Sequence, residues 1–211
     1  MAKAPVTEAA KPKRFTWVCK DRTHRICQGD IFRDMEYVEQ LEFVVDRIKT
    51  SVVGFPFIMV LTQDCDLEQD HRTRTMASDT NQDKHLFSVL VAPMYNYEHV
   101  KTGSHLRDLG MTMETINSKK SPFVMNNEIA RYHYLEFDQN EVPIPPSVID
   151  FKHYFSVNVE YFRRLKATNC VCRIAELHRE NVCQRFASFL ARIGLPDGNR
   201  NGGAAGVGKM G

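Results

Sequence analysis

The sequence contains no apolar run long enough to cross a membrane. Its longest apolar stretches, residues 55–61 and 86–93, are far shorter than the ~20 residues that a membrane-spanning helix requires. The N-terminal residues include lysines but no apolar core, so they do not resemble a secretory signal. An excess of one charge is also missing, because 28 basic residues are balanced by 26 acidic ones. We therefore expect a cytoplasmic protein without a membrane partner, in which any nucleic acid is bound by a local basic patch.

Cysteine pairs with a recognisable spacing are absent too. The six cysteines include no CxxC pair and follow no regular interval. Cys65, His71 and His85 have five and thirteen residues between them, which matches no common zinc-site spacing. We therefore predict that all six thiols are reduced and unpaired, and that the protein uses neither a metal nor another cofactor.

The composition is that of an ordinary globular protein, with 43% hydrophobic and 26% charged residues in a chain of 211. Such a chain is long enough to build a core without disulfides or a structural metal. The small, polar N-terminus predicts disorder over residues 1–13, and the Gly-rich tail predicts disorder over 197–211. Residues 14–196 are then expected to form a single β-barrel-like domain.

Short apolar segments and period-2 alternation dominate this body and predict a mainly β fold of the α+β type. The expected strands are residues 15–19, 27–35, 43–53, 55–63, 86–93, 129–137, 147–157 and 170–177. The expected helices are residues 97–109, 159–165 and 178–193. Segment 68–84 is polar and is predicted to be a long exposed loop.

Two of these strands should lie side by side at the centre of the sheet. Segments 55–63 and 86–93 are almost continuously apolar, which is typical of strands buried on both faces. Helix 178–193 carries one apolar stripe and should cover part of them.

A polar motif, Gln63-Asp64-Cys65-Asp66, follows the first of these buried strands. Polar residues at the end of a buried strand are held rigidly yet remain accessible, which is typical of a functional site. Because two acids disfavour a thiolate at Cys65, one interpretation gives the recognition or catalytic role to the acids. The other interpretation is structural: the acids cap a turn or the start of a helix, and Cys65 fills a small apolar hole.

An aromatic strand, Arg131-Tyr132-His133-Tyr134, is the second candidate. Its alternation places Arg131 and His133 on one face and the two tyrosines on the other. The first pair could hold a phosphate and transfer a proton, and the tyrosines could stack on bases. In the alternative, the tyrosines pack against the terminal helix and Arg131 pairs with a carboxylate such as Asp64 or Asp66.

We predict that the two groups meet in one pocket and that its carboxylates raise the pKa of His133. The predicted catalytic residues are Asp64, Cys65, Asp66, Arg131 and His133. The predicted binding residues are Gln63, His71, Arg72, Arg74, Tyr132 and Tyr134.

The order of several motifs resembles the MazF/PemK-like toxins, whose strands form an SH3-like barrel. The shared features are Gln28-Gly29-Asp30-Ile31-Phe32, a buried strand with a polar exit at 57–67, a second one ending at Ala92-Pro93, Ser147-Val148-Ile149-Asp150-Phe151, Arg163-Arg164-Leu165 and a terminal amphipathic helix. The chain is also similar to bacterial proteins that combine a Gln-Asp-Cys-Asp-Leu motif with an Arg-Phe and Arg-Ile-Gly-Leu-Pro ending. The resemblance implies an SH3-like or PemK-like barrel with long loops and a C-terminal amphipathic helix.

The resemblance also implies an RNA-acting or RNA-binding protein of a toxin–antitoxin or defence system. If it is an enzyme, it would be a metal-independent endoribonuclease, with His133 or an acid as base and Arg131 or Arg72 stabilising the phosphorane. The toxins have a Thr after the second strand's proline, whereas Met94 stands here. That departure favours one alternative, a non-catalytic barrel module that binds a partner protein or a nucleic acid; a homodimer is a separate expectation. The other alternative is a thiol-dependent enzyme centred on Cys65.

Overall fold

The computed structural model describes residues 15–19, 23–76 and 81–192. Seven strands form one antiparallel sheet in the order β4-β5-β3-β2-β1-β7, and β6 pairs with β3 off this path. The strands are β1 (Asp30–Val44), β2 (Arg47–Val60), β3 (Ser88–Asn96), β4 (Tyr132–Leu135), β5 (Ser147–Asp150), β6 (Phe155–Asn158) and β7 (Cys170–Arg173). The α-helices are α1 (Asp64–Thr75), α2 (Tyr97–Thr102), α3 (Ser121–Met125), α4 (Val159–Asn169) and α5 (Glu176–Leu190), with 3₁₀ turns η1 (Arg107–Leu109) and η2 (Phe151–His153).

The protein is therefore of the α+β class, as predicted, with a sheet that stays open in the described part of the chain. A closed SH3-like barrel is not confirmed. The two segments predicted to be disordered, 1–13 and 197–211, lie outside the described residues.

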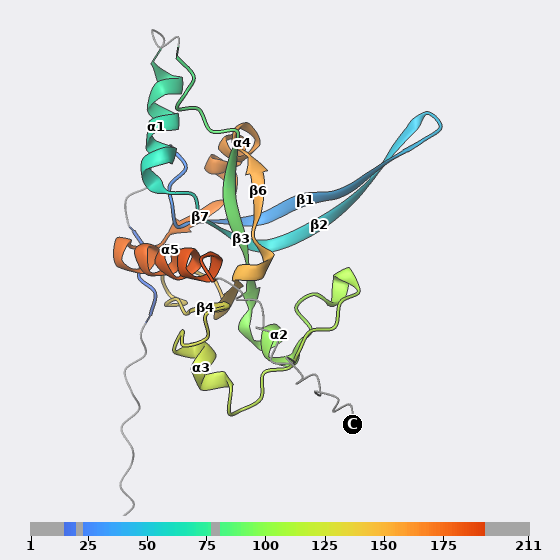
Figure 1. The fold of residues 1–211 in the computed structure, drawn as a ribbon, viewed down its shortest axis with the longest axis vertical. Helices are drawn as coiled ribbons and strands as arrows, with labels where there is room; N and C mark the ends of the chain where they lie inside the picture. The colour runs from blue at the N-terminus through green and yellow to red at the C-terminus, as the bar shows by residue number, and fades with distance from the viewer. Residues whose placement is uncertain (1–14, 20–22, 77–80, 193–211) are drawn as a thin grey trace, which may run out of the picture.

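The longest element is the hairpin of β1 and β2, which leaves the body as a two-stranded arm (Figure 1). It begins at the predicted Gly-Asp turn. Gly29 has φ +78°, and a Cβ there would lie 2.9 Å from Cγ1 of Ile174, so glycine is required by both conformation and space. The single strand predicted at 43–53 is wrong, because the chain reverses at Asp46, which adopts φ 64°.

The central pairing was predicted correctly. β2 and β3 are antiparallel neighbours, with Met59 opposite Ala92. Alternation sends Ile31 and Met59 to the face covered by α5, while Phe32 and Ile58 face α4 on the other side. The terminal helix, predicted at 178–193 and observed at Glu176–Leu190, buries Val182, Phe186 and Phe189 of its apolar stripe as expected, whereas Leu190 is exposed.

The prediction of one long loop over 68–84 is wrong, because α1 extends to Thr75. This helix has almost no apolar stripe: Leu67 is its only buried apolar residue, so hydrophobic periodicity could not reveal it. Asp64 and Asp66 in its first turn and Arg72 and Arg74 in its last turn instead fit the helix dipole.

Several other boundaries differ from the prediction. The strand expected at 147–157 is interrupted by η2, where the Asp150 side chain accepts a hydrogen bond from the Lys152 amide. The helix expected at 97–109 stops at Gly103, which has φ 72°. The segment at 15–19 forms only an isolated bridge, between Val18 and Ile174.

The remaining predicted strands are shorter than expected. Segment 129–137 is a strand only at Tyr132–Leu135, and 170–177 divides between β7 and the start of α5. The six cysteines are all free, as predicted. Among the described helices, none is both long and apolar enough to span a membrane.

Replacing Phe186 with Ala should lower the free energy of unfolding by ~3–5 kcal/mol, because it removes a ring buried between α5 and the sheet. Urea denaturation measures the change. Leu177→Ala on the same helix is the control, since Leu177 is 73% exposed and should matter by less than ~0.5 kcal/mol. Equal losses in the two variants would contradict the packing of α5.

Candidate functional site

Asp64, the first residue of α1, connects this helix to the segment that precedes β1. Arg25 donates two hydrogen bonds to its carboxylate, at 3.0 and 2.8 Å, and the Gln28 amide donates a third at 3.1 Å. Arg179 of α5 approaches to 3.9 Å. Burial alone would raise the pKa of Asp64, but these donors lower it below its ordinary value. The helix start predicted by the structural interpretation is confirmed, although Asp64 accepts from a distant segment and not from α1 itself.

The rest of the motif faces solvent. Gln63, Cys65 and Asp66 are exposed, and the Cys65 thiol donates only to Gln63 at 3.6 Å and Asp66 at 3.7 Å. Cys65 therefore does not fill an apolar hole. Its described hydrogen-bond partners include no cation that would activate a thiolate.

The basic residues predicted along this segment differ in their surroundings: Arg74 is half-buried and fully engaged by neighbouring groups, whereas Arg72 is open to solvent. Arg74 binds Asp70 at 2.7 Å, Glu160 at 2.8 Å and the Leu86 carbonyl at 2.8 Å. Arg72 is exposed and His71 is half-buried. Arg74 thus stabilises the packing of α1 against α4.

Arg131 is bound by a different acid from the one predicted. Its guanidinium holds the carboxylate of Asp150, with Nε 2.9 Å from each oxygen and a further bond from Nη2 to Oδ2. Asp150 is buried, and the ion pair joins the residue before β4 to the last residue of β5. The alternative that Arg131 pairs with a carboxylate is confirmed, but the acid lies on the neighbouring strand.

His133 is buried at 3% exposure beside Phe151, and its Nδ1 has no hydrogen-bond partner among the described residues. Burial, with smaller effects from Arg185 and His178, lowers its pKa to about 3. The expected rise in this pKa is therefore wrong. No carboxylate contributes to the shift, because the acids of the Gln-Asp-Cys-Asp motif lie elsewhere.

Helix α5 shows why the two predicted groups do not meet. Arg179 reaches toward Asp64, whereas Arg185 donates to the carbonyls of Ile129 and Tyr132 at 2.9 and 3.0 Å. Arg185 lies six positions after Arg179, a rise of about 9 Å along the helix. The five predicted catalytic residues therefore do not line one pocket.

The two tyrosines of β4 do not form a stacking platform. Tyr132 is buried, and Tyr134 donates to Glu136 at 3.1 Å while its ring contacts Tyr97 edge-on. Burial raises the pKa of both phenols. They pack in the cluster around α2 and α3, and not against the terminal helix as the alternative predicted.

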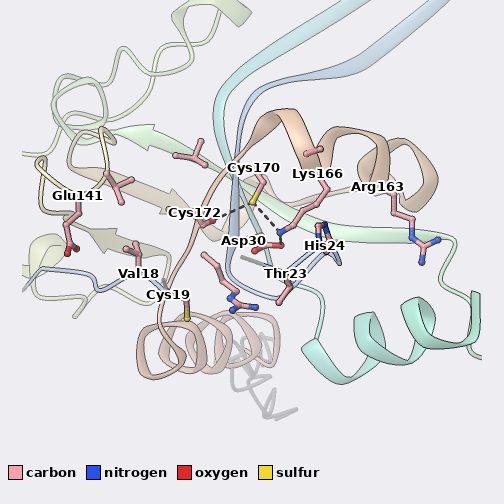
Figure 2. A pocket seen from close by; sticks show the side chains of 14 residues that line it. Val18, Cys19, Thr23, His24, Asp30, Glu141, Arg163, Lys166, Cys170 and Cys172 are labelled. Carbon is pink, nitrogen blue, oxygen red and sulfur yellow. Dashed lines mark hydrogen bonds and ion pairs between the residues drawn. The ribbon is translucent and has the colours of Figure 1, made fainter. Parts of the chain in front are cut away.

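A cavity of about 680 Å³ lies instead between α4, β7, the start of β1 and the residues Val18, Cys19, Thr23 and His24 (Figure 2). Its polar centre is a chain of three residues. Lys166 Nζ lies 2.5 Å from Asp30 Oδ2 and 3.3 Å from Cys170 Sγ, and the Cys27 amide donates to the same Asp30 oxygen at 2.7 Å. Burial raises the pKa of Asp30, with Lys166 opposing the rise. Burial also raises the pKa of Cys170.

The charged residues that line this cavity are more often basic than acidic. Arg163, Lys166 and Arg173 line it together with two acids, Asp30 and Glu141. Asp70 anchors Arg163 at 3.2 Å, and Arg173 donates to the Cys27 sulfur at 3.0 Å. In the described part of the chain, no group of three or more His, Cys, Asp or Glu side chains could hold a metal ion.

Sequence reasoning missed this site for an identifiable reason. In the sequence, Asp30 stands out only as part of a Gly-Asp turn, and Lys166 follows Arg163 and Arg164 as one more basic residue. The two are 136 residues apart, and no local pattern marks such a pairing. The one local signal was Lys166 and Cys170, four residues apart at the end of a helix, which brings them onto one face.

Comparison with known proteins adds no assignment: the sequence matches no protein-family model and no curated protein. The MazF/PemK-like resemblance stays a prediction from short motifs.

Lys166→Met should destabilise the protein by ~3–5 kcal/mol at neutral pH, because it leaves the buried Asp30 carboxylate without its cation. The folded-state pKa of Asp30 is already raised, and the substitution raises it further. The free energy of unfolding of the variant should therefore increase as the pH falls through the folded-state pKa of Asp30, and decrease again as the pH rises. Urea denaturation across pH measures this.

The control for this substitution is Lys101→Met, since Lys101 forms only an exposed pair with Glu98. Adding Asp30→Asn to Lys166→Met should restore part of the loss at neutral pH. A loss for Lys166→Met that does not change with pH would contradict a buried carboxylate as its cause.

His133→Leu should make stability less sensitive to acid. In the folded wild type the pKa of His133 is about 3, below its ordinary value. Because the pKa is lowered in the folded state, protonation of His133 favours the unfolded state. The free energy of unfolding is therefore unaffected by this group above the ordinary pKa of His, and it falls by roughly 1.4 kcal/mol per pH unit as the pH decreases from there towards 3. Urea denaturation at about pH 7 and about pH 5 measures the slope. His71→Leu on the surface of α1 is the control, and equal slopes in wild type and His133→Leu would refute the assignment.

Proposed function

We propose that this protein is an RNA-binding module and that the cavity between α4 and β7 receives one nucleotide of a single strand. The observation that carries the proposal is the cavity itself, about 680 Å³ and lined by three basic side chains and two acids, one of which, Asp30, is buried. Its volume falls within the roughly 300–1,000 Å³ of small-molecule sites, in which a few polar groups fix the ligand. Its lining suits an anion better than a neutral ligand.

The lining offers a partner for each part of a nucleotide. Arg163 is held by Asp70, so its guanidinium is positioned before a phosphate arrives. The Asp30–Lys166 pair offers an acceptor beside a donor, which suits a sugar hydroxyl or a base edge. Val18 and Val142 supply an apolar wall for a base.

Binding receives more support than cleavage. A general base must reach the proton that it removes, and His133 is buried with a lowered pKa. Arg131 is already engaged by Asp150. A role in a toxin–antitoxin or defence system, and the relation to the PemK-like barrels, are parts of the same proposal.

A thiol-dependent enzyme receives less support. Cys65 is exposed, and its described hydrogen-bond partners, Gln63 and Asp66, supply no cation of the kind that activates a nucleophilic thiol. Cys170 contacts Lys166, yet its pKa is raised by burial.

Fluorescence anisotropy with a labelled single-stranded RNA tests the proposal. Arg163→Gln should weaken binding about tenfold and reduce the slope of log K against log salt by about one, because it removes one phosphate contact. Arg164→Gln is the matched control: it makes the same charge change on the same helix, but Arg164 is exposed and does not line the cavity. Equal losses would indicate unspecific charge attraction and would overturn the site.

The same assay separates the alternatives. Single-stranded DNA of the same sequence should bind more weakly, because it lacks the 2′-hydroxyl. Gel analysis of the incubated RNA should show it intact. Cleavage abolished by Arg163→Gln would make the cavity an active site, and absence of RNA binding by the wild type would remove the proposal.

A further inference from the structure

The arm formed by residues 38–52 of β1 and β2 has no strand beside it in the described structure. β7 pairs with β1 only at Asp30–Phe32, and β3 pairs with β2 only at Ile58–Val60. Figure 1 shows the arm projecting away from the helices and the rest of the sheet. A two-stranded hairpin alone is only marginally stable in water, so an arm of this length is expected to gain from a partner.

The register of the hairpin gives the arm two different faces. Phe43 pairs with Ile48, Leu41 with Thr50, and Val38 with Val52, so these six side chains share one face. The opposite face carries Glu42 opposite Lys49, which form an ion pair at 3.7 Å, and Gln40 opposite Ser51. A bulge between Val38 and Gln40 keeps Val38 on the apolar side.

The apolar face is open to solvent. Its exposed fractions are 50% for Val38, 55% for Leu41, 81% for Phe43, 62% for Ile48 and 45% for Val52. Side chains of this size carry on the order of 100–200 Å² each, so the face presents roughly 500 Å², the size at which an exposed patch marks an interaction site.

We propose that this face packs against the same face of a second copy of the chain, forming a two-fold symmetric dimer through stacked arms. Between Val38 and Val52 the face contains no charged side chain, so a charged partner would lose solvation there without compensation. A second copy presents an uncharged surface of equal size, and its own Glu42–Lys49 pair stays in water. A two-fold contact of this kind uses one surface twice.

The area sets the strength of the dimer. Two faces bury roughly 1,000 Å² in total, at the lower limit for a specific interface, so the dimer should be reversible and not obligate. The proposal does not rest on RNA binding, because the arm lies outside the residues that line the cavity.

Analytical ultracentrifugation from about 1 to about 200 µM tests the proposal, because that range brackets micromolar association. The wild type should shift from monomer to dimer. Phe43→Ser should weaken the dimer at least tenfold, whereas Val44→Ser should not. Val44 is the matched control: it is the next residue, it is 54% exposed, and it points to the opposite face. Thermal unfolding at about 1 µM, where the protein is expected to be monomeric, should be the same in both variants, since neither residue belongs to a core cluster.

A crosslinking experiment tests the symmetry. The Leu41–Thr50 pair lies at the centre of the face, near the expected two-fold axis. In a Cys65→Ser background, Thr50→Cys should form a disulfide-linked dimer on mild oxidation, and Ser51→Cys on the other face should not. A wild type that stays monomeric throughout overturns the proposal and leaves a different protein as the occupant. A dimer that is unaffected by Phe43→Ser, or equal crosslinking of both cysteines, also overturns it.

Discussion

The buried carboxylate of Asp30 is the contact on which the arrangement of the sheet and two helices depends. It stands at the first residue of β1, accepts a hydrogen bond from the turn before it, and binds Lys166 of α4. The preceding Gly29 lets β7 and α5 approach, since a Cβ there would meet Ile174 and Arg179. One turn therefore fixes where the hairpin starts and where both covering helices lie. A charge this deeply buried is tolerated because its cation is in place.

Three other buried or half-buried acids, Asp64, Asp70 and Asp150, are also paired with cations. Arg25 binds Asp64, Arg74 and Arg163 bind Asp70, and Arg131 binds Asp150. Each of these acids has a basic partner, and most of the pairs join different elements of the fold. Three of the residues predicted for the site, Asp64, Arg131 and Arg74, are thus engaged in ion pairs that hold the protein together. This explains why no single cleft collects them, and why the basic cavity beside Asp30 is the stronger candidate for a ligand.

The cavity and the arm place two kinds of recognition at different parts of the molecule. The cavity is small, polar and basic, and it lies in the body between α4 and β7. The arm is an extended amphipathic ribbon whose apolar side is uncovered. If both proposals hold, the arms join two bodies and a dimer presents two nucleotide sites. Two linked sites bind one strand more tightly than either does alone when the strand can span them.

Local patterns in the amino-acid sequence were sufficient to identify the elements that bury an apolar run or stripe. Alternation and continuous apolar runs identified the centre of the sheet, the stripe on 178–193 identified α5, and the Gly-Asp pair identified the start of β1. The sequence could not reveal α1, because that helix is held by ion pairs and not by an apolar stripe. Nor could it show that Asp30 faces Lys166 or that His133 is enclosed. Those facts depend on which distant segments meet, and only the tertiary structure decides where a charge finds its partner.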